Sequence, residues 1–141
     1  MPFQIILTEG LVTKSRALLL HAEIVELFMS IHGISNNPFM LPNVIGEVVF
    51  IDHGQTFSGK EVRDIAVIEL KVPSFTFGTQ DLKNQFIERA TESVLAAAEG
   101  KLTKQQIWIN AVYTVDGFWG IAGKAYTNAE LGHAIQSSSH A

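Results

Sequence analysis

Pro2, which directly follows Met1, is the residue with the clearest chemical potential. Methionine is normally removed when a small residue such as proline follows it, and its removal would leave a free prolyl amine at the head of an apolar run. A terminal amine titrates at about 7.7–8.0 in peptides, and apolar surroundings lower that pKa because they disfavour the charged form. Such an amine would be a general base near neutral pH. The alternative is that Pro2 has no function, because proline is common at this position.

The other residue types that carry chemistry form no recognisable motif. No two of the five histidines have the spacing of a metal-binding motif such as HExxH, and we interpret each as a surface or capping residue: they are His21, His32, His53, His133 and His140. Gly-rich phosphate loops and a GxSxG serine are absent from the sequence. We therefore expect no metal ion and no organic cofactor.

The composition argues against several classes of protein. Ten Lys and Arg residues against 14 Asp and Glu residues give a formal net charge of −4, which disfavours a nucleic-acid surface or a polybasic membrane anchor. The chain has no cysteine, which excludes disulfides, thiolate catalysis and Cys-ligated zinc. No apolar run reaches the roughly 18–20 residues of a transmembrane helix, and the N-terminus does not resemble a secretory signal. We expect a cytoplasmic protein.

The apolar content predicts an ordered core and an oligomer. Hydrophobic residues make up 47% of the chain and charged residues 17%, and an average soluble domain has roughly 25% charged residues. A monomer this apolar would leave apolar patches on its surface, so we expect other subunits to cover them.

The order strand, helix, strand occurs twice along the chain. Hydrophobic patterning predicts strands at residues 2–7, 44–51, 65–72 and 107–113. Helices are expected after Thr13 and Thr79, whose side chains can cap them. Gly33 and Gly100 would end these helices. The glycine-rich residues 117–123 are expected to form a hairpin.

Two βαβ units predict an α+β fold with a four-stranded sheet and two helices on one face. An offset of 64 residues aligns the two halves, a pseudo-repeat of residues 2–60 and 65–124 within one domain, 1–135. A βαβ crossover pairs its strands in parallel and covers one face of the sheet. The other face would be apolar and must be buried, which favours subunit contacts. Residues 136–141 are expected to form a flexible tail.

Two short stretches resemble the tautomerase superfamily. Ile6-Leu7-Thr8-Glu9-Gly10 before a capped helix resembles the start of 4-oxalocrotonate tautomerase, and residues 118–124 resemble its aromatic and glycine-rich hairpin. The doubled length is similar to fused members such as macrophage migration inhibitory factor and cis-3-chloroacrylic acid dehalogenase. Residues 48–60 resemble a strand and hairpin of the dehalogenase group. The resemblance covers about residues 2–131 and implies a tautomerase-like fold and a homotrimer.

The resemblance also implies a site. In this superfamily an N-terminal proline is the general base of keto–enol tautomerisation, which corresponds to Pro2, and the hairpin aromatic that lines the pocket corresponds to Trp119. Leu11 and Trp108 stand where 4-oxalocrotonate tautomerase has arginines. Lys71 is the only cation at the end of the third strand, where related enzymes place arginines.

These residues predict an aromatic pocket with one cation. We expect Phe3, Trp108, Tyr113 and Trp119 to line it and Lys71 to contact substrate, although both tryptophans could instead pack in the core or between subunits. Lysine supplies a point charge but not the bidentate fork of arginine. The pocket should therefore favour monocarboxylate or aromatic enols over dicarboxylates.

Two functions remain open. The first is an enzyme that moves a proton alpha to the carbonyl of a small keto acid, with Pro2 as base in a pocket between subunits. The second is a non-catalytic trimer that binds a small ligand or partner, which Leu11 and Trp108 favour. A dimeric ferredoxin-like α+β barrel is the alternative fold.

Overall fold

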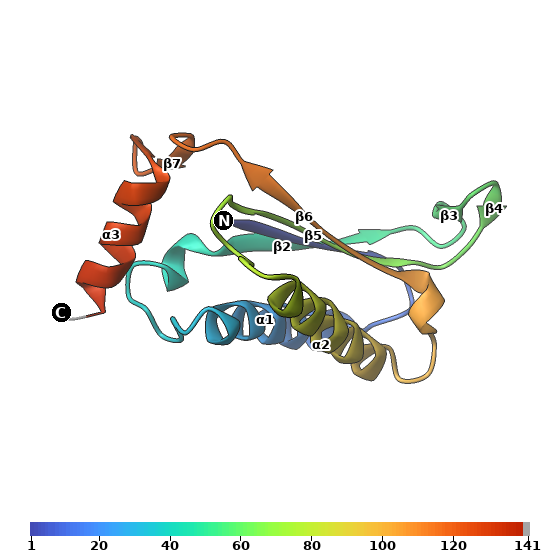
Figure 1. Cartoon of the computed structure of the whole chain (residues 1–141). Helices are drawn as coiled ribbons and strands as arrows, with labels where there is room; N and C mark the ends of the chain where they lie inside the picture. Colours follow the sequence, from blue (N-terminus) through green and yellow to red (C-terminus); the bar gives the residue numbers. More distant parts are fainter. Residues whose placement is uncertain (140–141) are drawn as a thin grey trace.

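The computed structural model, which describes residues 1–139, contains a four-stranded sheet with two long helices on one face (Figure 1). The strand order is β2-β1-β5-β6, where the strands are β1 (Pro2–Thr8), β2 (Ile45–Ile51), β5 (Ala66–Pro73) and β6 (Ile107–Thr114). β1 pairs with β2 in parallel, β5 pairs with β6 in parallel, and β1 and β5 are antiparallel. The predicted α+β fold with two tandem βαβ units is therefore confirmed.

The two helices of the βαβ units begin at the predicted caps. α1 (Lys14–Ile31) begins after Thr13, whose Oγ accepts a hydrogen bond from the Arg16 amide at 3.2 Å. α2 (Gln80–Ala98) begins after Thr79, whose Oγ accepts from the Leu82 amide at 3.3 Å. Each side chain satisfies an amide that would otherwise lack a partner in the first helical turn.

Shorter elements lie at both ends of the sheet (Figure 1). They are η1 (Leu41–Asn43), β3 (Phe57–Ser58), β4 (Glu61–Val62), η2 (Lys104–Gln106), β7 (Trp119–Ile121) and β8 (Lys124–Tyr126). β3 and β4 form a hairpin that projects beyond one end of the sheet. β7 and β8 form the predicted glycine-rich hairpin beyond the other end, where the N-terminus also lies.

A third helix, α3 (Asn128–Ser138), is absent from the sequence expectations. The Oγ of Thr127 caps it by accepting from the Glu130 amide at 3.1 Å, and the Asn37 side chain donates to the carbonyl of Ile135 at 2.9 Å. The helix continues through Ser138, so it includes residues assigned above to a flexible tail. Residues 140 and 141 of that predicted tail lie outside the described residues.

The core fills the space between the sheet and its two helices. Side chains alternate along each strand, and every second one points toward α1 and α2. Those of the two central strands are at most 1% exposed: Phe3, Ile5, Leu7, Ala66, Ile68, Leu70 and Val72. The opposite face of the sheet has no helix on it, and we refer to it below as the open face.

His32 joins the end of α1 to the loop between β5 and α2. Its Nδ1–H donates to the Phe28 carbonyl at 2.8 Å, and its Nε2 accepts from the Phe77 amide at 3.1 Å. The ring lies between Phe28 and Phe77, with centroid distances of 4.6 and 4.8 Å. Burial lowers the pKa of His32, and its hydrogen bond to the Phe28 carbonyl only partly offsets this. The fold therefore holds His32 neutral.

We expect the free energy of unfolding to fall as the pH drops below about 6.5, the ordinary pKa of histidine. The lowered pKa in the folded state means that the unfolded chain binds a proton that the fold excludes. Above that pH both states are neutral at His32 and the contribution is constant. Urea unfolding at pH 7.5 and pH 5.0 measures the change.

The variant His32→Asn isolates this contribution, because the amino terminus and the carboxylates titrate alike in both proteins. Its loss of stability between the two pH values should be smaller than that of the wild type. His133→Asn, at an exposed histidine that is in none of the ion pairs of residues 1–139, is the matched control and should keep the wild-type pH dependence. An equal pH dependence in His32→Asn and the wild type would contradict this role of His32.

Candidate active site

The strand register brings Lys71 beside Pro2. Phe3 lies opposite Leu70 in the antiparallel pair of β1 and β5, and continuing this register by one residue places Pro2 opposite Lys71. Directly opposite residues of such a pair have Cα atoms about 4.5–5.5 Å apart and side chains on the same face. Because Phe3 faces the helices, Pro2 and Lys71 share the open face.

The amino terminus lies in a buried and apolar environment at the start of β1. The Met1 amine donates a hydrogen bond to the Asn43 carbonyl, and the Ile45 amide donates to the Met1 carbonyl at 3.0 Å. The Met1 side chain is 7% exposed and packs in the core. Burial lowers the pKa of the Met1 amino group from 8.0 to about 6. The Met1 amine is therefore mostly neutral at pH 7.

A row of polar residues adjoins Pro2 and Lys71 on the open face. The Gln4 amide donates to a carboxylate oxygen of Glu47 at 2.8 Å, and Glu69 lies opposite Gln4 on the other side of β1. Both carboxylates are on the strands that flank Pro2. The surface near the proline therefore combines one lysine with two acidic side chains. Side chains alternate along β1, so Gln4 and Pro2 lie on the same face, and this alternation could have identified Gln4 from the sequence.

A glycine allows the first two strands to approach each other beside this site. A Cβ atom on Gly46, which pairs with Phe3, would lie 2.1 Å from the Phe3 carbonyl oxygen and 2.5 Å from Nε2 of His21. Both distances are shorter than contacts that real Cβ atoms make. Glycine at position 46 therefore permits β2 to lie close to the strand end that carries Pro2.

The two tryptophans occupy different environments. Trp119 is buried at the base of the β7–β8 hairpin, and its Nε1 has no hydrogen-bond partner within residues 1–139. Trp108 is 41% exposed on the open face of the edge strand β6. It pairs with Val67, which lies opposite Ile6. Trp108 is thus four residues and two strands from Pro2, about 16 Å at standard strand spacings, so these two residues do not meet within one subunit.

Phe3 and Tyr113 lie on the helix side of the sheet rather than beside Pro2. Phe3 is fully buried, with its ring 4.9 Å from that of Phe28. Tyr113 donates its hydroxyl proton to the Thr76 carbonyl at 2.8 Å. The sequence grouped both with Pro2 in one pocket, and the structure separates them because neighbouring strand residues point to opposite faces. Of the predicted substrate contacts, Lys71 is the one that the register places directly opposite Pro2.

Neither a metal centre nor a membrane span is found in the described chain. Among residues 1–139, no group of three or more His, Cys, Asp or Glu side chains could hold a metal ion. No helix in the same range is long and apolar enough to cross a membrane.

Solved structures of low sequence identity share the fold of this chain. No protein-family model and no curated protein matches the chain. The solved structure of Q0 fused 4-OT, a symmetric trimer, is 14% identical with a TM-score of 0.75, covering 94% of this chain and 99% of that chain. A macrophage migration inhibitory factor-like protein from Entamoeba histolytica is 15% identical with a TM-score of 0.68, covering 89% of this chain and 97% of that one. N1, a member of the cis-3-chloroacrylic acid dehalogenase family, is 16% identical with a TM-score of 0.67, and both chains are covered completely.

Proposed function

We propose that this chain, which has the fold of the tautomerase superfamily, is a keto–enol tautomerase of small monocarboxylate keto acids with the Pro2 amine as its general base. The observation that carries the proposal is the environment at the start of β1. There, burial lowers the pKa of the Met1 amine, one residue before Pro2, to about 6, and Lys71 lies on the neighbouring strand. An amine in such surroundings can accept the proton next to a carbonyl, and an adjacent cation can bind the carboxylate of the substrate.

The proposed base forms when Met1 is removed. In the chain with Met1 present, the Pro2 nitrogen is an amide and has no useful basicity. Removal makes it a secondary amine at the same end of β1. The Met1 side chain is buried, so its departure also empties a space next to the new amine.

The proposed reaction needs one group that accepts a proton and then returns it. The neutral Pro2 amine accepts the proton from the carbon alpha to the carbonyl, and the electron pair of that C–H bond forms the C=C bond of an enolate. The protonated amine then returns the proton to the enolate oxygen, which completes the enol. The reverse sequence converts the enol to the ketone. No other reactant is required.

The charges on the open face support a substrate with one carboxylate. Lys71 would bind it as a point charge. Glu47 and Glu69, which lie on the two strands beside Pro2, would repel a second carboxylate. Leu11 is buried and apolar and supplies no charge. We therefore expect phenylenolpyruvate to be turned over faster than 2-hydroxymuconate, which has two carboxylates.

A homotrimer would complete the pocket. The open face carries exposed apolar side chains at Ile45, Trp108 and Val112, and the β3–β4 hairpin exposes Phe57 and Val62. The fused 4-OT structure described above is a trimer. Burial of these side chains against neighbouring subunits would remove apolar surface from water. The same contact would bring Trp108 of a neighbouring subunit to Pro2. Light scattering at low micromolar protein measures the oligomer, and a monomer would contradict this part of the proposal.

Replacing Lys71 by Met is expected to raise the KM for phenylenolpyruvate about tenfold, the effect of losing one hydrogen bond to a charged group. The kcat should change little, because Lys71 would hold the carboxylate equally in the ground state and the transition state. The measurement is the absorbance change of the enol at a series of substrate concentrations, on protein whose intact mass shows that Met1 is absent.

Lys104→Met is the matched control, since Lys104 is exposed in η2 at the end of the sheet away from the N-terminus. It should leave both constants unchanged. Equal KM values for wild type and Lys71→Met would show that Lys71 does not contact the carboxylate.

Non-catalytic binding is the second candidate, and two residues favour it. Leu11 and Trp108 stand at the positions where 4-oxalocrotonate tautomerase, which the sequence resembles, has arginines. Saturable binding of phenylpyruvate, without turnover by protein that lacks Met1, would establish this function instead.

A further inference from the structure

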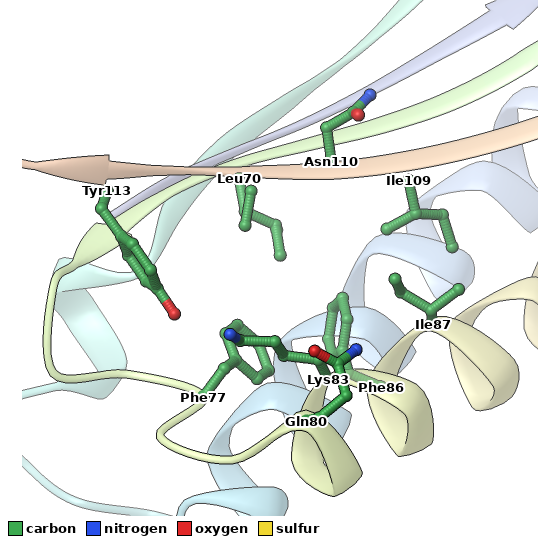
Figure 2. A pocket seen from close by; sticks show the side chains of 10 residues that line it. Leu70, Phe77, Gln80, Lys83, Phe86, Ile87, Ile109, Asn110 and Tyr113 are labelled. Carbon is green, nitrogen blue, oxygen red and sulfur yellow. The ribbon is translucent and has the colours of Figure 1, made fainter.

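A cleft of about 300 Å³ opens between the edge strand β6 and the first turns of α2 (Figure 2). Its walls are mainly apolar and come from the sheet, the loop before α2 and α2 itself: they are Leu70, Phe77, Phe86, Ile87 and Ile109. The volume is at the lower end of the roughly 300–1,000 Å³ of small-molecule pockets. A space of this kind suits a ligand with a small apolar body.

One cation and one amide lie among these apolar walls. Lys83 and Gln80 also line the cleft, and Figure 2 shows both side chains on its α2 side. The Lys83 side chain is only partly exposed. The ion pairs within residues 1–139 are Arg16–Glu23, His53–Asp64 and Lys124–Glu130, so no carboxylate neutralises Lys83 in the described chain. An unpaired ammonium beside an apolar cleft favours an anionic ligand.

The aromatic wall of the cleft is held rigidly. The Phe77 amide donates to Nε2 of His32 at 3.1 Å, and the Tyr113 hydroxyl donates to the Thr76 carbonyl at 2.8 Å. The Phe77 ring also packs against Phe86 with a centroid distance of 5.1 Å. These contacts fix the loop on both sides, so a ligand would not have to order it. A preformed wall lowers the entropic cost of binding.

The cleft is separate from the surface around Pro2. Tyr113 and Leu70 lie on the helix side of the sheet, whereas Pro2 and Lys71 lie on the open face. Asn110 adjoins the cleft only through its backbone, because its side chain points away from it in Figure 2. Occupation of the cleft therefore does not require the proposed catalytic function.

We propose that this cleft is a second binding site, for a small arylalkyl monocarboxylate. The aromatic ring of the ligand would lie against Phe77 and Phe86 in an offset or edge-on arrangement. Its carboxylate would accept hydrogen bonds from the Lys83 ammonium and the Gln80 amide. The short alkyl link would lie against Ile87 and Ile109.

The test is an NMR titration of the intact protein with 3-phenylpropanoate, which has no keto group and so cannot be a tautomerase substrate. Saturable shifts of the Phe77, Lys83 and Ile87 amides are expected. Lys83→Met should weaken binding about tenfold, as one lost charged hydrogen bond implies. Lys104→Met is the control and should bind like the wild type. Lys71→Met removes the cation beside Pro2 and should also bind 3-phenylpropanoate like the wild type, which separates this site from the proposed catalytic one.

A second variant tests the location of the binding site without removing a charge. Ile87 is 46% exposed, so Ile87→Trp can fold while its larger side chain fills the cleft, and it should abolish the shifts. Circular dichroism checks that the variant is folded. Shifts centred on Lys71 and lost in Lys71→Met, equal affinities of Lys83→Met and Lys104→Met, or no saturable shifts would each overturn the proposal.

Discussion

Blocking the Pro2 amine is expected to lower kcat/KM for phenylenolpyruvate by about 10²–10⁴-fold, the usual contribution of a general acid–base group. Acetylation of the terminus, or retention of Met1, converts the basic nitrogen into an amide that cannot accept a proton from carbon. The measurement compares blocked and free protein, each identified by its intact mass. The secondary structure should be the same in both forms, because the described fold already contains Met1 at this position.

Pro2→Ala separates the amine from the ring. Alanine is also small enough to permit removal of Met1, and it leaves a primary amine at the same strand end. Its activity should lie between those of the free and blocked proteins, and light scattering should give the same oligomer for all three. Equal activity of free and blocked protein would contradict a catalytic role for the amine and would leave the binding function as the alternative.

Phe28→Ala is expected to lower the free energy of unfolding by about 3–5 kcal/mol, the usual cost of removing a buried phenylalanine ring. Phe28 is 1% exposed, and its ring contacts those of Phe3, His32 and Phe77. The cavity left by alanine would loosen the connection between β1, α1 and the loop before α2. Urea unfolding at pH 7.5 measures the loss.

Phe28→Leu serves as the control, because leucine keeps most of the apolar volume. Its cost should be less than about 1.5 kcal/mol, as for swaps that conserve volume. Similar losses for the two variants would indicate that the ring contacts, rather than the cavity, dominate the stability at this position.

Local signals in the sequence were sufficient to predict the four strands of the sheet and the two helices that cover it. Thr13 and Thr79 could be recognised as caps because each precedes a run with helical periodicity, and both cap helices in the structure. α3 also had a signal: Thr127 followed by Glu130 has the spacing of a capping box. Leu131 is its one buried side chain, so few apolar positions marked the helix.

The candidate site depended on pairing that no local pattern specifies. The position of Lys71 beside Pro2 requires the antiparallel register of β1 and β5, and α1, β2 and the β3–β4 hairpin separate these two strands in the sequence. Alternation could nevertheless have removed two candidates. Phe3 is next to Pro2 in one strand, so the two side chains face opposite sides of the sheet. Tyr113 is five residues from Trp108 in another strand, so these two also face opposite sides.

The most direct test of the proposed base is a ¹⁵N NMR titration of the Pro2 nitrogen in the purified protein. A free secondary amine that titrates below the ordinary terminal pKa of about 8 is expected, because burial lowers the pKa of the Met1 amine at the same strand end to about 6. A nitrogen with the shift of an amide that does not titrate, or an amine with a pKa of about 8 or higher, would contradict the account.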